Sequence, residues 1–102
     1  MTGAKMNEVL MRKGERADRL YYLSDGEVEV DGKNKLVLAP ALIGEIGVFA
    51  PDQRRMATVR CRTDCTLYEL SQSKAKELYF QDPSFGYAVL QLAIARLLEN
   101  QQ

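Results

Sequence analysis

Two glycines and two arginines lie close together in the middle of the chain, in a pattern that suits anion binding. Gly44 and Gly47 carry no side chain, so the backbone there can approach a ligand closely. The turn Glu45–Phe49 is too short for a free-standing helix, and its exposed N–H groups can cradle a phosphate. A guanidinium from Arg54 or Arg55, in the loop that follows, can close this cradle. The pattern predicts a local phosphate site.

Glu45 is the unexpected member of this group, because a carboxylate repels a phosphate. It can instead face away and accept hydrogen bonds from hydroxyl groups, for which a ribose is the natural source. A phosphate beside a sugar hydroxyl indicates a nucleotide. Two simpler interpretations stay open at this point. Glu45 can be a helix-start carboxylate that the helix dipole stabilises, and Arg55 can be a surface arginine paired with Asp52 or another carboxylate.

Composition excludes several other classes of function. The chain has 102 residues, which suits one domain with one core. Its 14 basic and 14 acidic side chains cancel, so the domain lacks the positive field that non-specific binding to nucleic acid or anionic membranes would use. Histidine is absent, which removes the commonest general base and metal ligand. Cys61 and Cys65 lack the second pair that a zinc site needs, so we expect both to be structural and predict no metal and no catalytic residue.

The elements that position the site are predicted from periodicity and turn residues. Short strands are expected at Val9–Arg12, Arg19–Leu23, Glu27–Val30, Leu36–Leu38, Met56–Arg60 and Thr66–Leu70. Asp25-Gly26 and Asp31-Gly32 each lie between runs of β-forming residues, which predicts two tight hairpins. Many short antiparallel strands favour a β-barrel or jelly roll, the double-stranded β-helix, over residues 7–70.

The pattern becomes helical from Ser71 onward. Ser71 is expected to cap a short helix that ends before Pro83, and a second helix begins with Pro83 and runs to the end of the chain. The fold class is therefore mainly β with a short helical turn at Glu45–Phe49 and C-terminal helices over residues 71–101, all within one domain of residues 1–102.

The segment from Ile43 to Val59 resembles the phosphate-binding cassette of the cyclic-nucleotide-binding domain family, shared by catabolite activator proteins, kinase regulatory subunits and gated channels. The resemblance extends to Arg12-Lys13-Gly14-Glu15, to Ala17-Asp18-Arg19-Leu20-Tyr21-Tyr22 and to Asp25-Gly26-Glu27-Val28-Glu29-Val30, which are similar to the family's early hairpins. Asp64-Cys65-Thr66-Leu67-Tyr68-Glu69-Leu70 is similar to its last barrel strand. The likeness covers Val9 to Leu98.

The resemblance implies a role for each residue of the cassette. Glu45 would bind the ribose 2′-hydroxyl and Arg55 the cyclic phosphate, while Ala57 would be the small residue beside the ligand. The ligand-binding residues it implies are Gly44, Glu45, Ile46, Gly47, Arg55, Met56 and Ala57. The end of the last helix supplies a candidate lid over the base, formed by Leu97, Asn100 and Gln101.

Met56 departs from the family pattern, because many members carry Ser, Thr or Ala directly after the arginine. A methionine offers no hydroxyl to a guanine edge, so we expect cAMP to be favoured over cGMP. The same residue supports an alternative, in which the domain binds no nucleotide and serves as a docking or dimerisation module. An enzyme or metal site of the cupin type is disfavoured, since such sites usually need two or three histidines.

The function implied by the resemblance is regulatory and not enzymatic. Binding of a cyclic nucleotide, cAMP or cGMP, would tighten the turn Gly44–Phe49, reposition the apolar contacts of Val48 or Phe49, and move the helices from Ser71 onward. We expect this chain to be a cytoplasmic module of a larger polypeptide, whose effector is a channel, a transporter, a kinase or a transcription regulator. We expect no direct contact with nucleic acid, no cofactor besides the nucleotide, and a homodimer through the last helix as one assembly.

Overall fold

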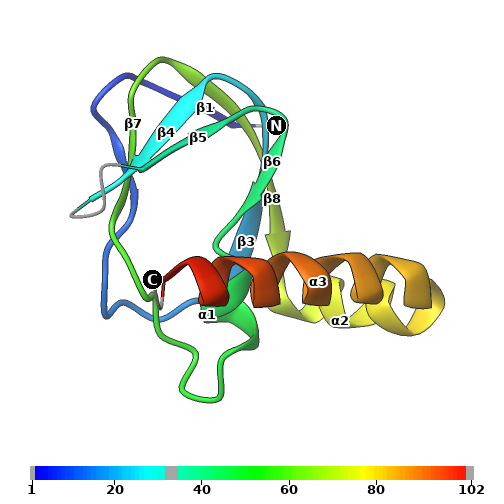
Figure 1. The fold of residues 1–102 in the computed structure, drawn as a ribbon. Helices are drawn as coiled ribbons and strands as arrows, with labels where there is room; N and C mark the ends of the chain where they lie inside the picture. The colour runs from blue at the N-terminus through cyan, green and yellow to red at the C-terminus, as the bar shows by residue number, and fades with distance from the viewer. Residues whose placement is uncertain (1, 32–34, 101–102) are drawn as a thin grey trace.

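Short strands followed by two longer helices make up this computed structural model, which describes residues 2–31 and 35–100. The strands are β1 (Thr2–Ala4), β2 (Val9–Met11), β3 (Arg19–Asp25), β4 (Glu27–Val30), β5 (Lys35–Leu38), β6 (Ala41–Ile43), β7 (Val59–Cys61) and β8 (Cys65–Ser71). The helices are α1 (Glu45–Phe49), α2 (Gln72–Gln81) and α3 (Pro83–Asn100). Figure 1 shows α2 and α3 lying across one end of the β structure.

The strands form two four-stranded antiparallel sheets with the orders β1-β8-β3-β6 and β2-β7-β4-β5. Buried side chains from both sheets form one core, which includes Met11, Leu23, Val28 and Leu67. No pairing among the described strands joins one sheet to the other, so they do not close into a single barrel. The predicted class, mainly β of the jelly-roll type with C-terminal helices, is confirmed.

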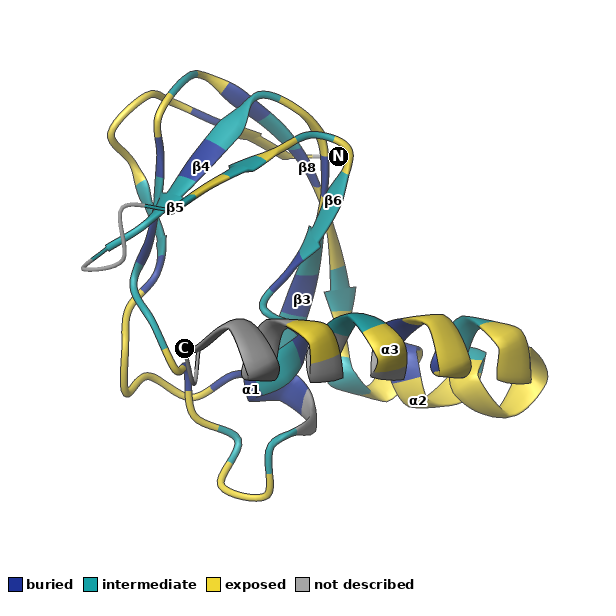
Figure 2. Cartoon of the chain, viewed as in Figure 1, coloured by how far each residue is buried: buried dark blue, intermediate teal, exposed yellow. Residues whose placement is uncertain are grey.

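A second, smaller core joins the helices to the first sheet. Ala17, Leu20, Val48 and Ala75 are all fully buried and pack together, which places α1 and α2 against β3. The helix α2 begins as the sequence predicts, because the Ser71 side chain accepts a hydrogen bond from the Lys74 N–H at 3.1 Å. Figure 2 shows that α1 is largely buried, whereas much of α2 is exposed.

Two of the strands escaped prediction, and one predicted hairpin is wrong. β1 and β6 are three residues each and contain Gly or Ala, so they carry little β-forming signal. Asp25-Gly26 does not form a hairpin, because β3 pairs with β6 and β8 while β4 pairs with β5 and β7. Gly26 instead carries the chain from one sheet to the other, with a φ of 105°. The second hairpin is confirmed by the pairing of Val30 with Lys35.

Both cysteines are buried and free, as expected for structural residues. Burial, with the neighbouring Cys65, raises the pKa of the Cys61 thiol to about 12, which keeps it protonated and unreactive. No helix in residues 2–31 and 35–100 combines the length and hydropathy needed to cross a bilayer.

Gly26→Ala is expected to destabilise the domain more than Gly14→Ala. Both residues have a positive φ, of 105° and 89°, which costs an alanine roughly 1–2 kcal/mol. An added Cβ at Gly26 would also lie 2.7 Å from the Asp64 carbonyl oxygen, whereas at Gly14 it would meet nothing within 4 Å. We expect this crowding to add about 1–3 kcal/mol to the loss in unfolding free energy, measured by urea denaturation. Equal losses for the two variants would show that crowding at Gly26 has no effect.

Candidate functional site

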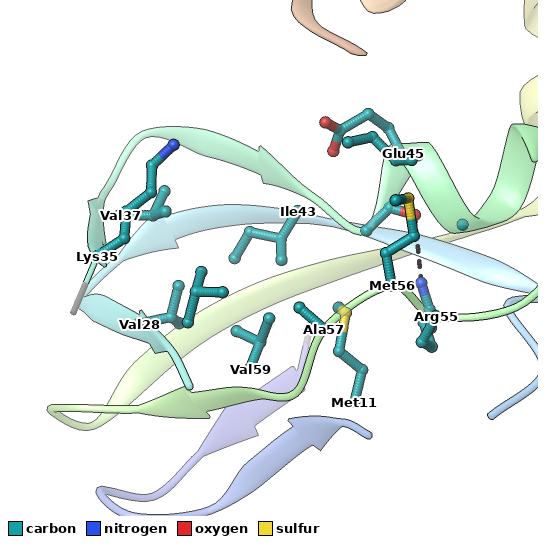
Figure 3. A pocket seen from close by; sticks show the side chains of 14 residues that line it. Met11, Val28, Lys35, Val37, Ile43, Glu45, Arg55, Met56, Ala57 and Val59 are labelled. Carbon is teal, nitrogen blue, oxygen red and sulfur yellow. Dashed lines mark hydrogen bonds between the residues drawn. The ribbon is translucent and has the colours of Figure 1, made fainter. Parts of the chain in front are cut away.

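A cavity of about 330 Å³ opens between the two sheets beside α1. All seven ligand-binding residues that the sequence singled out line it: Gly44, Glu45, Ile46, Gly47, Arg55, Met56 and Ala57. The rest of the wall is mostly apolar and comes from the inner faces of the strands, with Met11, Val28, Val30, Val37, Ile43 and Val59. Figure 3 shows these side chains around the cavity. An apolar cavity of this size with a few polar groups is typical of a small-molecule site.

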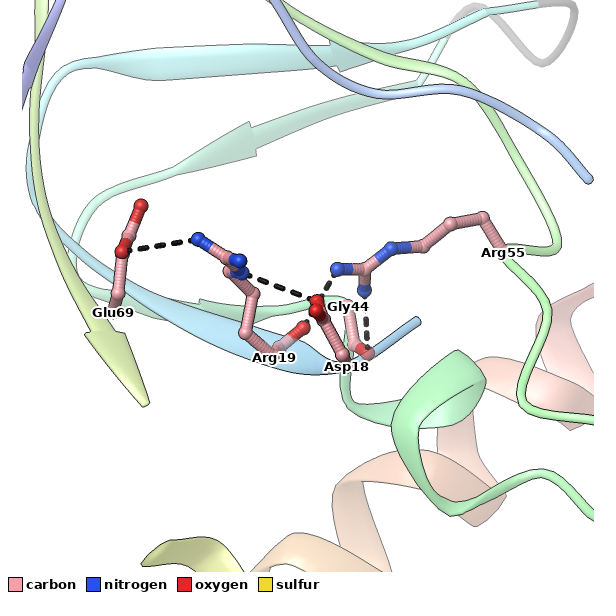
Figure 4. Close-up of polar contacts among 5 residues, drawn as sticks. All are labelled: Asp18, Arg19, Gly44, Arg55 and Glu69. Carbon is pink, nitrogen blue, oxygen red and sulfur yellow. Dashed lines mark hydrogen bonds and ion pairs between the residues drawn. The ribbon is translucent and has the colours of Figure 1, made fainter. Parts of the chain in front are cut away.

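Arg55 is a buried arginine at the cavity wall, with 6% of its surface exposed. Its guanidinium donates hydrogen bonds to the Gly44 carbonyl oxygen at 3.2 Å and to the Arg19 carbonyl oxygen at 2.7 Å (Figure 4). Its backbone N–H donates to the Glu15 carbonyl oxygen at 2.8 Å. Burial lowers the pKa of Arg55, but an arginine remains charged at physiological pH. The cavity therefore carries a fixed positive charge.

The interpretation of Arg55 as a surface arginine paired with Asp52 is wrong. The Asp52 carboxylate accepts a hydrogen bond from the Arg54 N–H at 3.2 Å instead. Arg54 is exposed, and its guanidinium reaches only the Gly14 carbonyl oxygen at 3.5 Å. Of the two adjacent arginines, Arg55 alone is among the described residues that line the cavity.

Gly44 has a conformation and a position that exclude a side chain. Its φ is 86°, and an added Cβ would lie 2.6 Å from Nη1 of Arg55 and 3.0 Å from Cε of Met11. At Gly47 an added Cβ would lie 2.9 Å from Cβ of Ala17 and 3.0 Å from the Arg54 carbonyl oxygen. The sequence attributed both glycines to close approach of a ligand. The structure shows that each one also gives room to neighbouring protein atoms.

Glu45 is the first residue of α1 and is 1% exposed. The first N–H groups of a helix lack intrahelical acceptors, so this turn presents donors as well as a carboxylate. Figure 3 shows Glu45 close to Met56 and Arg55, at the end of the cavity away from Lys35. Because Glu45 begins a helix and also lines the cavity, its helix-start role and its ribose role both remain compatible with the fold.

Met56 lies at the rim of the cavity, and the side chains of the candidate lid lie outside the described part of the chain. Met56 is 48% exposed at the rim of the cavity. Leu97 and Asn100 belong to α3, but their side chains lie outside the described part, as does the whole of Gln101. The lid therefore stays a prediction.

Hydrogen bonds connect the cavity to α2. Arg55 donates to the carbonyl of Arg19, and the preceding carbonyl, that of Asp18, accepts from the Gln72 N–H at 2.9 Å. The Gln72 side chain also donates to the Val48 carbonyl oxygen of α1 at 3.1 Å.

On the outer surface, the Arg19 side chain forms ion pairs with Asp18 and Glu69, and its hydrogen bond to Asp18 lowers the pKa of that carboxyl. These exposed ion pairs add little stability.

Sequence reasoning missed the cavity residues that the strands supply. Val28, Val30, Lys35 and Val37 all line the cavity from β4 and β5. Their spacing of two along each strand is the signal that places them on one face. That signal identifies a shared face, but it does not say that the face borders a cavity.

Comparisons with known proteins point to one family. A family model described as the cyclic nucleotide-binding domain matches residues 3–82. The cAMP-activated global transcriptional regulator CRP of Salmonella typhimurium is 37% identical over 82 residues, covering 72% of this chain and 39% of that protein. The corresponding regulator of Pasteurella multocida is 32% identical over 99 residues, covering 89% of this chain and 47% of that protein. The chain thus spans less than half the length of these relatives.

Solved structures share the fold. One, from work on a cyclic-GMP-dependent signalling pathway that regulates bacterial phytopathogenesis, has a TM-score of 0.85 at 24% identity and covers 99% of this chain and 85% of that chain. Another, a putative cyclic nucleotide-binding protein from Geobacter metallireducens, has a TM-score of 0.75 at 16% identity, with 99% and 77% covered. At these identities the likeness concerns the fold alone.

Proposed function

The chain belongs to the cyclic nucleotide-binding domain family, and on that premise we propose that the cavity beside α1 binds one cyclic nucleotide as a regulatory signal. Members of this family regulate and are not enzymes, so the domain is a binding module. The observation that carries the proposal is the buried guanidinium of Arg55 at the cavity wall, next to the start of α1. A buried positive charge that faces a cavity favours an anionic ligand.

The cyclic phosphate binds to Arg55 and to the backbone turn of Gly44–Gly47. A guanidinium has five N–H donors, and the bonds to the Gly44 and Arg19 carbonyls use two of them. Arg55 can thus hold the loop in place and still donate to phosphate oxygens. Glu45, on the same turn, accepts from the ribose 2′-hydroxyl, which separates its negative charge from the phosphate. Met56 and Ala57 border the ligand from the following loop.

The base lies against the apolar strands, and cAMP is favoured over cGMP by a modest factor. Met56 supplies no hydroxyl for the guanine edge, and an apolar wall discriminates only weakly between bases. The relatives from Salmonella typhimurium and Pasteurella multocida are named as activated by cAMP, which supports this preference. The structural neighbour from a cyclic-GMP pathway shows that cGMP must be tested alongside it.

Ligand binding is relayed to α2 and α3 through α1. Val48 of α1 packs in the same small core as Ala75 of α2, and Gln72 bonds to the Val48 carbonyl oxygen. A shift of the turn Gly44–Phe49 toward the phosphate therefore changes contacts that α2 makes. Ligand binding can therefore shift an equilibrium between two positions of the helices, which is what a population shift requires.

A transcription regulator is the effector best supported among the types that the resemblance allows, because the relatives from Salmonella typhimurium and Pasteurella multocida are named as transcriptional regulators. Three further expectations remain predictions: no direct binding of nucleic acid by this chain, a homodimer through α3, and a cytoplasmic location.

The departure of Met56 from the family pattern favours the alternative, in which the domain is a docking module that binds no nucleotide. The cavity lined by all seven candidate residues weighs against it.

Arg55→Ala is expected to weaken binding of cAMP by roughly 1.5–3 kcal/mol, because the phosphate loses charge-assisted hydrogen bonds. Arg54→Ala is the matched control, since it removes the same charge from the exposed neighbour, and should change binding by less than about 0.5 kcal/mol. Isothermal titration measures both, after circular dichroism has shown that each variant is folded. Similar losses at both positions, or none at either, would contradict the phosphate role of Arg55.

The ribose role of Glu45 predicts that 2′-deoxy-cAMP binds the native domain more weakly than cAMP, by about tenfold for a lost charge-assisted hydrogen bond. Glu45→Gln should shrink this difference, because a neutral amide oxygen is a weaker acceptor. Competition against a fluorescent cyclic nucleotide measures all four affinities. A native domain that binds both nucleotides equally leaves Glu45 only its helix-start role.

Met56→Thr is expected to move the preference toward cGMP, because it restores a hydroxyl where the guanine amino group would lie. The native domain should prefer cAMP by a modest factor. The same competition assay, run with cAMP and cGMP on both proteins, gives the two ratios. A native preference for cGMP would overturn the proposed selectivity.

The relay predicts that saturating cAMP changes amide hydrogen exchange in the first turn of α2 as well as in residues 44–49. Gln72→Ala should reduce the change in α2 while leaving the change in residues 44–49, since it removes the bond to Val48. Gln81→Ala is the control, because Gln81 lies in the same helix and its side chain donates to the Glu77 carboxylate. An unchanged exchange response of α2 in Gln72→Ala would contradict a relay through the bond from Gln72 to Val48.

A further inference from the structure

Met56 is a sulfur-containing residue that lines the cavity and is also open to solvent. It is 48% exposed, whereas Met11, in the wall of the same cavity, is 5% exposed. Cys61 and Cys65 are buried as well. In the part of the chain that the structure describes, Met6 is the other exposed sulfur-containing residue, at 58%, and it does not line the cavity. Met56 is thus the described sulfur-containing residue that both lines the cavity and is exposed.

The Met56 side chain lies at the end of the cavity where the charged groups of the proposed phosphate site lie. Figure 3 shows it close to Glu45 and Arg55. The Arg55 guanidinium uses donors for the Gly44 and Arg19 carbonyls, and the proposed function assigns its remaining donors to the phosphate. A thioether sulfur is only a weak acceptor, so native Met56 does not compete for those donors. A chemical change at this sulfur would therefore act beside the groups that hold the phosphate.

We propose that Met56 is an oxidation site, and that conversion of its thioether to the sulfoxide by a peroxide weakens binding of the cyclic nucleotide. This proposal rests on the proposed function, because it takes the cyclic phosphate to be bound at Arg55. Its two steps, the oxidation and the loss of affinity, have separate physical reasons and separate measurements.

The oxidation is a two-electron transfer of one oxygen atom. With hydrogen peroxide, the sulfur lone pair attacks one peroxide oxygen, the O–O bond breaks, and hydroxide leaves. The hydroxide takes the proton from the new S–OH group, which gives the sulfoxide and one water molecule. The sulfur is oxidised and the peroxide is reduced by the same two electrons. Exposure decides which methionines react, so Met6 and Met56 are expected to react before Met11.

The loss of affinity follows from the oxygen that the sulfur gains. A sulfoxide is polar, and its oxygen carries a partial negative charge and accepts hydrogen bonds. It competes with the phosphate for the spare donors of Arg55 and for the N–H groups of the turn Gly44–Gly47, and it repels the phosphate oxygens. A bound nucleotide in turn covers Met56, because both border the same cavity, and so slows its oxidation.

Peptide mass spectrometry after timed exposure to hydrogen peroxide tests the first step. The native domain should gain one oxygen at Met6 and at Met56 faster than at Met11. Saturating cAMP should slow the reaction at Met56 several-fold and leave the rate at Met6 unchanged. An equal rate at Met56 with and without cAMP would show that the nucleotide does not cover this residue, and would overturn the proposal.

Isothermal titration with cAMP before and after peroxide treatment tests the second step. The native domain should lose about tenfold in affinity, as expected for one charge-assisted hydrogen bond. Methionine sulfoxide reductase should restore the affinity, because it reverses this oxidation. Met56→Leu, compared with its own untreated form, should show no effect of peroxide. Met6→Leu is the matched control, since it makes the same substitution at the exposed methionine outside the cavity, and should stay as sensitive as the native domain.

Two results would overturn the role of Met56 while the binding of cyclic nucleotides stands. One is an unchanged affinity of the native domain when mass spectrometry shows that Met56 is fully oxidised. The other is a peroxide effect of native size that persists in Met56→Leu. A native domain that binds neither cAMP nor cGMP before oxidation would instead overturn this proposal together with the proposed function.

Discussion

The two hydrogen bonds from the Arg55 guanidinium to the Gly44 and Arg19 carbonyls hold together the wall of the cavity on which the proposed function depends. One carbonyl precedes α1 and the other begins β3, so a single side chain fastens the loop after α1 to both. Burial makes each bond costly to lose, because an unpaired carbonyl or guanidinium would then remain out of water. The glycine at position 44 follows from this constraint, since a Cβ there would collide with Nη1 of Arg55. The same geometry leaves the remaining guanidinium donors available to an anion in the cavity.

The fold has two hydrophobic cores with different roles. The larger core between the sheets fixes the strands whose inner faces form the cavity wall. The smaller core of Ala17, Leu20, Val48 and Ala75 couples α1 to α2. Because α1 contributes to the cavity through Glu45 and to the smaller core through Val48, it takes part in both the proposed binding site and the proposed relay. Such a short helix cannot be stable alone, so its position follows whichever contacts its neighbours offer.

Sequence reasoning grouped seven residues that line one cavity because their signals are local. The glycines, Glu45 and Arg55 occur within a short segment, and their residue types specify a chemistry. The Ser71 cap and Pro83 likewise marked the helices through the backbone groups beside them. The Asp25-Gly26 hairpin failed because turn chemistry does not tell which sheet the next strand joins. Lys35 was missed for a related reason: its inward position depends on the register of β5 against β4, and Leu36 and Leu38 are the residues that hydrophobicity alone would turn inward.

The central claim is that this domain binds a cyclic nucleotide in the cavity beside α1. The most direct measurement is isothermal titration of the native chain with cAMP and, separately, with cGMP, repeated at several temperatures. Saturable binding of one nucleotide per chain, with a negative heat-capacity change from burial of the base against the apolar strands, is the predicted result. Titrations that give no saturable heat with either nucleotide at any temperature, together with an unchanged thermal midpoint at high ligand concentration, would contradict it.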